Sequence, residues 1–233
     1  MTSDNTIDRT QNSFLYKNLA NIASLVGVLP LLLLYVEDGY HYLIPLILFN
    51  NVMDDLDGIL AAKLNIRSRF GADLDNVCDA VAHVALSLAV GAHYGGIVLS
   101  VSVVAAGAII LRATSRLNPE GTSGGSPTNE LMRHLLFILL LSSVFGIDAE
   151  PLLISVFLLN TVSMSVPFKM TAMIRSQAKT AILVVLVNLA LISAWLFPST
   201  TAFIALPFLL TYLYALLMGG VRWISSYSSP TSV

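Results

Sequence analysis

Long apolar runs separated by short polar segments cover most of the chain. An apolar run of about 18 or more residues is typical of a membrane-spanning helix, because about 20 helical residues cross a hydrocarbon core of about 30 Å. The runs do not alternate between polar and apolar positions, so they predict helices and not half-buried strands. Several runs are short and need flanking residues to complete a crossing. The eight runs that we interpret as spans are 19–36, 42–64, 72–92, 97–111, 131–145, 152–166, 181–196 and 202–218.

The composition supports a membrane protein. Hydrophobic residues make up 56% of the 233 residues and charged residues only 11%, whereas soluble globular domains carry about 25% charged residues. We therefore predict an all-α, polytopic membrane helical bundle with about eight transmembrane helices. It forms a single integral-membrane domain over residues 1–233, with a polar N-terminal segment at 1–13 and a C-terminal tail at 225–233.

The basic residues of the chain fall on one side of this arrangement. With eight spans, all 12 Lys and Arg residues lie before the first span, in or at the border of alternate loops, or after the last span. The opposite loops hold acidic residues such as Glu37 and Asp148 and no basic residue. Because basic loops stay on the cytoplasmic side, we expect cytoplasmic termini, in the inner membrane of a prokaryote.

Four aspartates stand at helical spacing on the two sides of one short loop. Asp54 and Asp57 lie near the end of the second run, and Asp75 and Asp79 lie at the start of the third. Residues three or four apart share a helix face, so antiparallel neighbouring helices would bring the two pairs to one depth. Carboxylates at such short distances repel one another in a low dielectric and need a compensating cation. Hard divalent ions such as Mg²⁺, Mn²⁺ or Ca²⁺ take oxygen ligands, so the pattern indicates a metal site on the cytoplasmic side.

Other residues of the segment leave two interpretations open. Asp55 and Asp73 stand off the shared face, and we expect each to be solvated or to support the other acids from behind. Small residues between the acids leave the helix surface bare, either for a bulky ligand or for close packing of helices. These small residues are Gly58, Ala61, Ala62, Gly71 and Ala72.

Residues 54–79 read D-x-x-D-G-x-x-A-A-x8-G-x-x-x-D-x-x-x-D. This pattern resembles the signature of the CDP-alcohol phosphatidyltransferases, D-x-x-D-G-x-x-A-R-x8-G-x-x-x-D-x-x-x-D, at seven of its eight fixed positions. The resemblance implies a six-helix catalytic core that transfers a phosphatidyl group from CDP-diacylglycerol to an alcohol and releases CMP. It also implies that two divalent metal ions, Mg²⁺ or Mn²⁺ with Ca²⁺ as an alternative, are held by Asp54, Asp57, Asp75 and Asp79, and that Asp79 is the catalytic base. The nucleotide would be bound by Asp54, Gly58, Ala61, Lys63 and Gly71.

One position departs from the signature. Ala62 stands where the family has Arg, and Lys63 follows it. Lys63 lies about 100° further around the helix, and a lysine does not give the bidentate contacts of an arginine. Lys63 can serve the nucleotide phosphates only by reaching around the helix.

Three further segments resemble the integral-membrane phosphatidylserine synthases: LDNVCDAVAH at 74–83, LRATSRLNPEGTSGGSPTN at 111–129 and VSMSVPFK at 162–169. This resemblance implies L-serine as the acceptor and phosphatidylserine as the product. The carboxylate of serine suits basic side chains near a cytoplasmic site. The residues that we expect to bind the acceptor are Arg112, Arg116, Asn118, Ser126, Ser163 and Lys169.

Other functions remain open from the sequence. The same chemistry on glycerol 3-phosphate, an inositol phosphate or choline fits the signature equally well. A non-catalytic cation-binding membrane protein or a transporter is the third alternative, although transport acids usually lie along a path between both faces. The partners implied by the resemblance are CDP-diacylglycerol, a small alcohol, membrane lipid and a second copy in a homodimer; no nucleic acid partner is expected.

Overall fold

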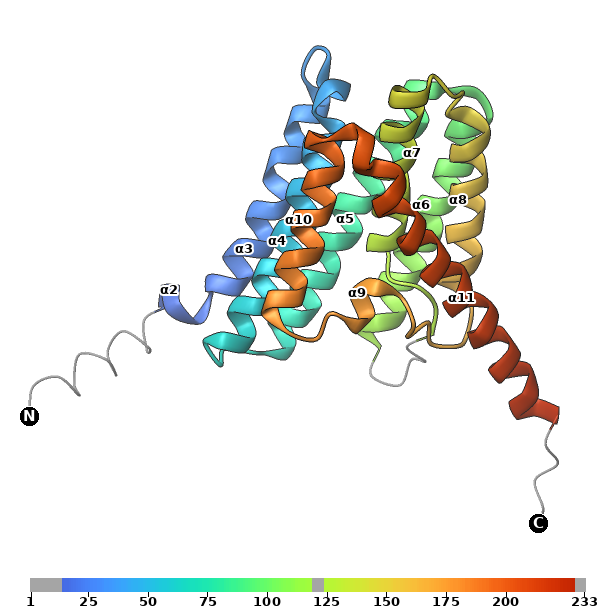
Figure 1. Cartoon of the computed structure of the whole chain (residues 1–233). Coiled ribbons are helices and arrows are strands. Elements are labelled where there is room, and N and C mark those ends of the chain that lie inside the picture. Colours follow the sequence, from blue (N-terminus) through green and yellow to red (C-terminus); the bar gives the residue numbers. More distant parts are fainter. Residues whose placement is uncertain (1–13, 119–123, 229–233) are drawn as a thin grey trace, which may run out of the picture.

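The chain folds into a bundle of helices that run up and down beside one another (Figure 1). The computed structural model describes residues 14–118 and 124–228, so the predicted N-terminal segment 1–13 lies outside the described residues. The all-α prediction is confirmed. In chain order the elements are α2 (Phe14–Lys17), α3 (Leu19–Val28), η1 (Leu29–Tyr35), η2 (Gly39–Tyr42), α4 (Leu43–Lys63), α5 (Arg69–Tyr94), α6 (Gly96–Leu117), α7 (Asn129–Phe145), α8 (Glu150–Ser165), α9 (Ile174–Gln177), α10 (Ala181–Leu196), η3 (Pro198–Thr200) and α11 (Thr201–Ser228).

The eight apolar runs all fall in helical segments, with differences of a few residues at their ends. In the first run the α-helix gives way to the 3-10 helix η1, which has Pro30 in its first turn; proline has no N–H to continue the α-helical bonding. Within the described residues, three segments are long and apolar enough to cross a membrane by length and composition: Arg69–Tyr94, Gly96–Leu117 and Pro198–Ser226. The segments Leu19–Tyr35, Glu150–Ser165 and Ala181–Leu196 are shorter apolar helices.

Helix α7 lies at the centre of the bundle. Every residue from Glu130 to Leu140 is buried, and α7 packs against α4, α5, α8, α10 and α11. A helix that is apolar on all sides needs an apolar environment, which either other helices or lipid can provide, and other helices provide it for α7. Its two charged residues, Glu130 and Arg133, are therefore buried too, each 2% exposed.

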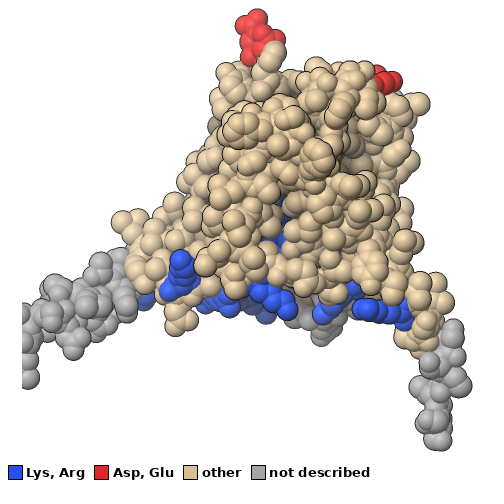
Figure 2. All heavy atoms as spheres, viewed as in Figure 1, with Lys and Arg blue, Asp and Glu red and all other residues tan. Residues whose placement is uncertain are grey.

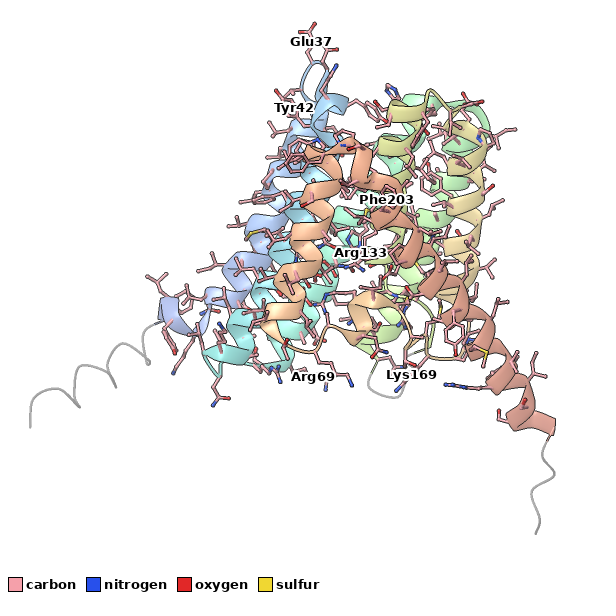
Figure 3. All side chains as sticks on the ribbon, viewed as in Figure 1. Glu37, Tyr42, Arg69, Arg133, Lys169 and Phe203 are labelled. Carbon is pink, nitrogen blue, oxygen red and sulfur yellow. The ribbon has the colours of Figure 1, made fainter. Side chains whose placement is uncertain are left out.

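The charges separate the molecule into two ends. Figure 2 shows Lys and Arg side chains along one end of the bundle, with Asp and Glu side chains at the opposite end. In Figure 3 the labelled Arg69 and Lys169 lie at the basic end and Glu37 lies at the far tip. Arg133 instead lies inside the bundle (Figure 3).

Helix α11 extends into the segment that was predicted as the C-terminal tail. Helix α11 continues to Ser228, so 225–228 are helical, and 229–233 lie outside the described residues. The serines are accommodated because their hydroxyls bond back to helix carbonyls: Ser225 Oγ donates to Val221 O at 2.9 Å, and Ser226 Oγ donates to Trp223 O at 2.6 Å.

Candidate active site

A tight turn between α4 and α5 brings the aspartates of the two helices together. Asn65 adopts φ 53° after the end of α4, a left-handed conformation that asparagine tolerates well. Ser68 then caps α5, its Oγ accepting a hydrogen bond from Gly71 N at 2.9 Å. The chain thus reverses within a few residues, and the two helices run antiparallel with their acids at the same end of the bundle.

Three of the four predicted metal ligands converge. One carboxylate oxygen from each of Asp54, Asp57 and Asp75 lies within 4.8 Å of the others. Asp79 is 7% exposed and lines a cavity of about 210 Å³ together with Asp54 and Asp75. A set of carboxylate oxygens at this spacing suits a hard divalent cation, so these residues could hold a metal ion.

Two side chains from other helices orient the acids. Ser24 of α3 donates a short hydrogen bond to Asp57 Oδ2. Asn129, the first residue of α7, donates from Nδ2 to Asp54 Oδ2 at 2.7 Å. Each bond fixes one oxygen and leaves the other oxygen of the carboxylate to face its neighbours. Neither Ser24 nor Asn129 belongs to the aspartate pattern, so the pattern did not predict their contacts with the acids.

Asp55 supports the site from behind and is not solvated. Its side chain is 3% exposed, because Asp55 lies about 100° around α4 from Asp54 and points toward α9 and α10. Arg175 donates to Asp55 Oδ1 from Nε at 2.8 Å and also from Nη2, and Asn188 Nδ2 donates to Oδ2 at 2.6 Å. Asp73, in contrast, has a side chain that is 42% exposed, and it forms a 3.8 Å ion pair with Arg69.

The contacts of Asp55 extend into a buried polar chain that reaches α7. Asn188 Oδ1 accepts a hydrogen bond from Asn51 Nδ2 at 2.7 Å, and Asn51 Oδ1 accepts one from Arg133 Nη2 at 3.0 Å. Arg133 Nη1 donates to Glu130 Oε1 at 2.6 Å. The sequence signal for this chain was charge inside an apolar run, which is costly and usually functional.

The predicted nucleotide residues are divided between two environments. Gly58 and Lys63 line a cavity of about 480 Å³, which Ala62, Arg67, Arg175 and Lys179 also line. A Cβ added at Gly58 would meet nothing within 4 Å, whereas one at Gly71 would come within 3.0 Å of Asn21 Oδ1. Gly58 therefore keeps a surface open, and Gly71 allows α5 to approach α3. Ala61 is half-buried on α4.

The predicted acceptor residues are also divided. Arg116 lines the cavity of the aspartates. Ser126 and Ser163 are 0% exposed and bond to each other at 2.7 Å, while Arg112 Nε donates to Ser126 O at 3.3 Å. These contacts fix the segment before α7 onto α8 through Ser163 and onto α6 through Arg112. Asn118 is exposed at the end of α6, and exposed Lys169 lines a separate cavity of about 290 Å³.

His83 holds the same segment from the other side. Its ring is 1% exposed, and Nδ1 lies 2.8 Å from Thr128 Oγ1. Thr128 precedes Asn129, the residue that binds Asp54. The histidine therefore acts on the site through the position of α7.

Comparison with known proteins agrees with the geometry of the site. The family model for CDP-alcohol phosphatidyltransferase matches residues 17–227. No individual curated protein matches the chain. The matched range contains the four aspartates. It also contains the helices that carry or orient them, α3, α4, α5 and α7. The chain therefore belongs to the CDP-alcohol phosphatidyltransferases, divalent-metal-dependent membrane enzymes that transfer substituted phosphate groups in phospholipid head-group synthesis.

Proposed function

We propose that this enzyme transfers the phosphatidyl group of CDP-diacylglycerol to the hydroxyl of L-serine, forming phosphatidylserine and CMP. The observation that carries the proposal is the cavity in which Asp54, Asp75 and Asp79 face Arg116. It combines a place for divalent metal with a cation suited to the carboxylate of the acceptor. The three segments that resemble phosphatidylserine synthases favour serine over the other alcohols.

Asp54, Asp57 and Asp75 are the ligands proposed for one Mg²⁺ or Mn²⁺ ion. Asp79 is the further ligand with which the same group of acids would bind a second ion. Bound divalent ions would neutralise the donor phosphates and stabilise charge on the reacting oxygens. The protein's own part is to hold these carboxylates in place through Ser24 and Asn129.

Asp79 is the proposed catalytic base. The hydroxyl oxygen of serine attacks the phosphorus that carries diacylglycerol, and its proton passes to a carboxylate oxygen of Asp79. A new P–O bond to serine forms as the P–O bond to CMP breaks, and CMP leaves with the electron pair. Arg116 binds the serine carboxylate and so orients the hydroxyl.

The cavity at Gly58 is the proposed site for the nucleotide. Position 62 lacks the arginine of the family signature, and the cations around this cavity offer a substitute. Lys63 comes from the same helix, while Arg67 and Lys179 come from later segments. These side chains suit the two phosphates of the donor.

A bulky side chain at Gly58 is expected to block this cavity. Gly58→Leu should raise KM for CDP-diacylglycerol at least tenfold, because the side chain would occupy the open space beside Lys63. Gly107→Leu is the matched control, since a Cβ at Gly107 on α6 also meets nothing within 4 Å. Steady-state CMP release over a range of donor concentrations measures both; equal effects of the two variants would contradict the assignment.

The proposed membrane arrangement has eight crossings with both termini and the active site in the cytoplasm. The basic end of the bundle (Figure 2) supports this orientation through the positive-inside rule. The aspartates near that end would meet a substrate whose tails lie in lipid and whose nucleotide lies in water. A homodimer in the inner membrane of a prokaryote is the proposed assembly.

CMP release by the purified protein in detergent tests the function. With CDP-diacylglycerol and Mg²⁺ or Mn²⁺, we expect release with L-serine and none when EDTA removes the metal. Glycerol 3-phosphate, inositol 1-phosphate and choline are tested separately. Release with one of these and not with serine would keep the reaction and overturn the acceptor; no release with any acceptor from folded protein would overturn the function.

A further inference from the structure

The first turn of α7 forms one wall of the aspartate cavity. Asn129, Glu130 and Arg133 line it together with Asp79 and Arg116. Its volume of about 210 Å³ is below the roughly 300–1,000 Å³ of pockets for drug-sized ligands. A small acceptor suits this space better than an inositol phosphate.

The cations on this wall differ in how far they are already neutralised. Arg175 pairs with Asp55, and Arg133 pairs with Glu130 at 2.6 Å with both side chains 2% exposed. Among residues 14–118 and 124–228, Arg116 forms none of the salt bridges, and it is exposed to the cavity. Of these three arginines, Arg116 therefore has the charge that is most available to the acceptor.

Arg133 still has capacity for one ligand atom. Its Nε is buried and has no hydrogen-bond partner among the described residues, which is costly unless an acceptor fills the place. An oxygen of a bound substrate in the cavity would satisfy this donor. The guanidinium would then bind Glu130 through Nη1, Asn51 through Nη2 and the substrate through Nε.

Glu130 is the unexpected member of the wall. A buried carboxylate beside an acceptor site repels an anionic acceptor and attracts a cationic group. Glu130 and Arg133 lie side by side, so the wall presents a negative and a positive group in contact. A ligand with an ammonium and a carboxylate on adjacent atoms is complementary to such a pair.

We propose that Glu130 and Arg133, together with Arg116, select a zwitterionic amino-acid acceptor: Glu130 binds its ammonium, and the two arginines bind its carboxylate. This inference rests on the proposed function, since it assigns chemistry to the acceptor side of the same cavity. It makes Glu130 and Arg133 specificity-determining residues that the aspartate signature does not contain.

Three acceptors distinguish the contact of Glu130 with the ammonium from the contact of the arginines with the carboxylate. L-serine carries both groups, ethanolamine lacks the carboxylate, and 3-hydroxypropanoate lacks the ammonium. Glu130→Gln should lower kcat/KM at least tenfold for serine and for ethanolamine, and leave 3-hydroxypropanoate unchanged or improved. Arg116→Gln should lower it at least tenfold for serine and for 3-hydroxypropanoate and spare ethanolamine. Arg69→Gln, at an exposed arginine on α5 outside the cavity, should leave all three values unchanged.

The outcomes distinguish this inference from the proposed function. An equal loss for all three acceptors in Glu130→Gln would mean that Glu130 only stabilises the fold, and would overturn the inference alone. Glu130→Asp keeps the carboxylate and should restore the preference for serine. If Glu130→Gln does not fold, the acceptor preferences of Arg116→Gln and Glu130→Asp still test the inference. No CMP release by folded wild-type protein with any acceptor would overturn the function and the inference together.

Discussion

Replacing Asp79 with Asn is expected to lower kcat for CMP release by about 10²–10⁴-fold, the contribution typical of general acid–base catalysis. The Asp79 side chain is 7% exposed and lines the same cavity as Asp54, Asp75 and Arg116. Asparagine keeps the size and polarity of the side chain but does not accept the proton of the attacking hydroxyl. Release of CMP at saturating serine, donor and Mg²⁺ measures the change.

Asp73→Asn is the control for this variant. Asp73 lies on the same helix, but its side chain is 42% exposed and its 3.8 Å ion pair with Arg69 lies in solvent. Exposed ion pairs contribute little to stability, and Asp73 lies outside the group of converging carboxylates, so full activity is expected. If Asp79→Asn retains more than a tenth of wild-type activity at unchanged thermal stability, Asp79 is not the base.

Asp55→Leu is expected to lower the free energy of unfolding by about 3 kcal/mol, the lower end of the cost of breaking a buried ion pair. Asp55 accepts hydrogen bonds from Arg175 and from Asn188, and leucine removes the carboxylate that both side chains share. The lower end applies because the Arg175 side chain is 32% exposed and regains water. Unfolding in detergent micelles, followed by the loss of helical circular dichroism, measures the effect.

The matched comparison is Asp73→Leu, which should change the free energy of unfolding by less than about 1 kcal/mol. Adding Arg175→Met to Asp55→Leu should recover part of the loss, because the unpaired guanidinium is removed with its partner. A stability of Asp55→Leu within 1 kcal/mol of wild type would mean that α4 does not depend on this contact with α9 and α10.

The central aspartates were predictable because their arrangement is local. Spacings of three and four residues place each pair on one helix face, and the short link between α4 and α5 forces an antiparallel return. Both facts lie within residues 54–79, and the family signature covers the same range. The convergence of Asp54, Asp57 and Asp75 follows from helical geometry with little help from the rest of the chain.

The surroundings of the aspartates were not predictable in the same way. Asp54 and Asp55 are neighbours in sequence, yet the first faces the cavity and the second is held by Arg175 and Asn188. Only the position of α9 and α10, more than 100 residues further along the chain, decides which side of α4 is buried. Ser126 and Ser163 likewise matched a family pattern, and their complete burial became visible only once α8 was placed against the segment before α7.

By itself the sequence determined the all-helical architecture, the end of the bundle that carries the basic residues and the spacing of the four aspartates, of which Asp54, Asp57 and Asp75 converge. These features depend on hydrophobic periodicity and on spacings within one or two turns, which each segment carries alone. Only the tertiary structure decided that α7 is the central helix, that Glu130 and Arg133 line the aspartate cavity, and that Arg116 among the predicted acceptor residues faces the acids. The physical reason is that burial and pairing of a charged side chain depend on which distant helices surround it.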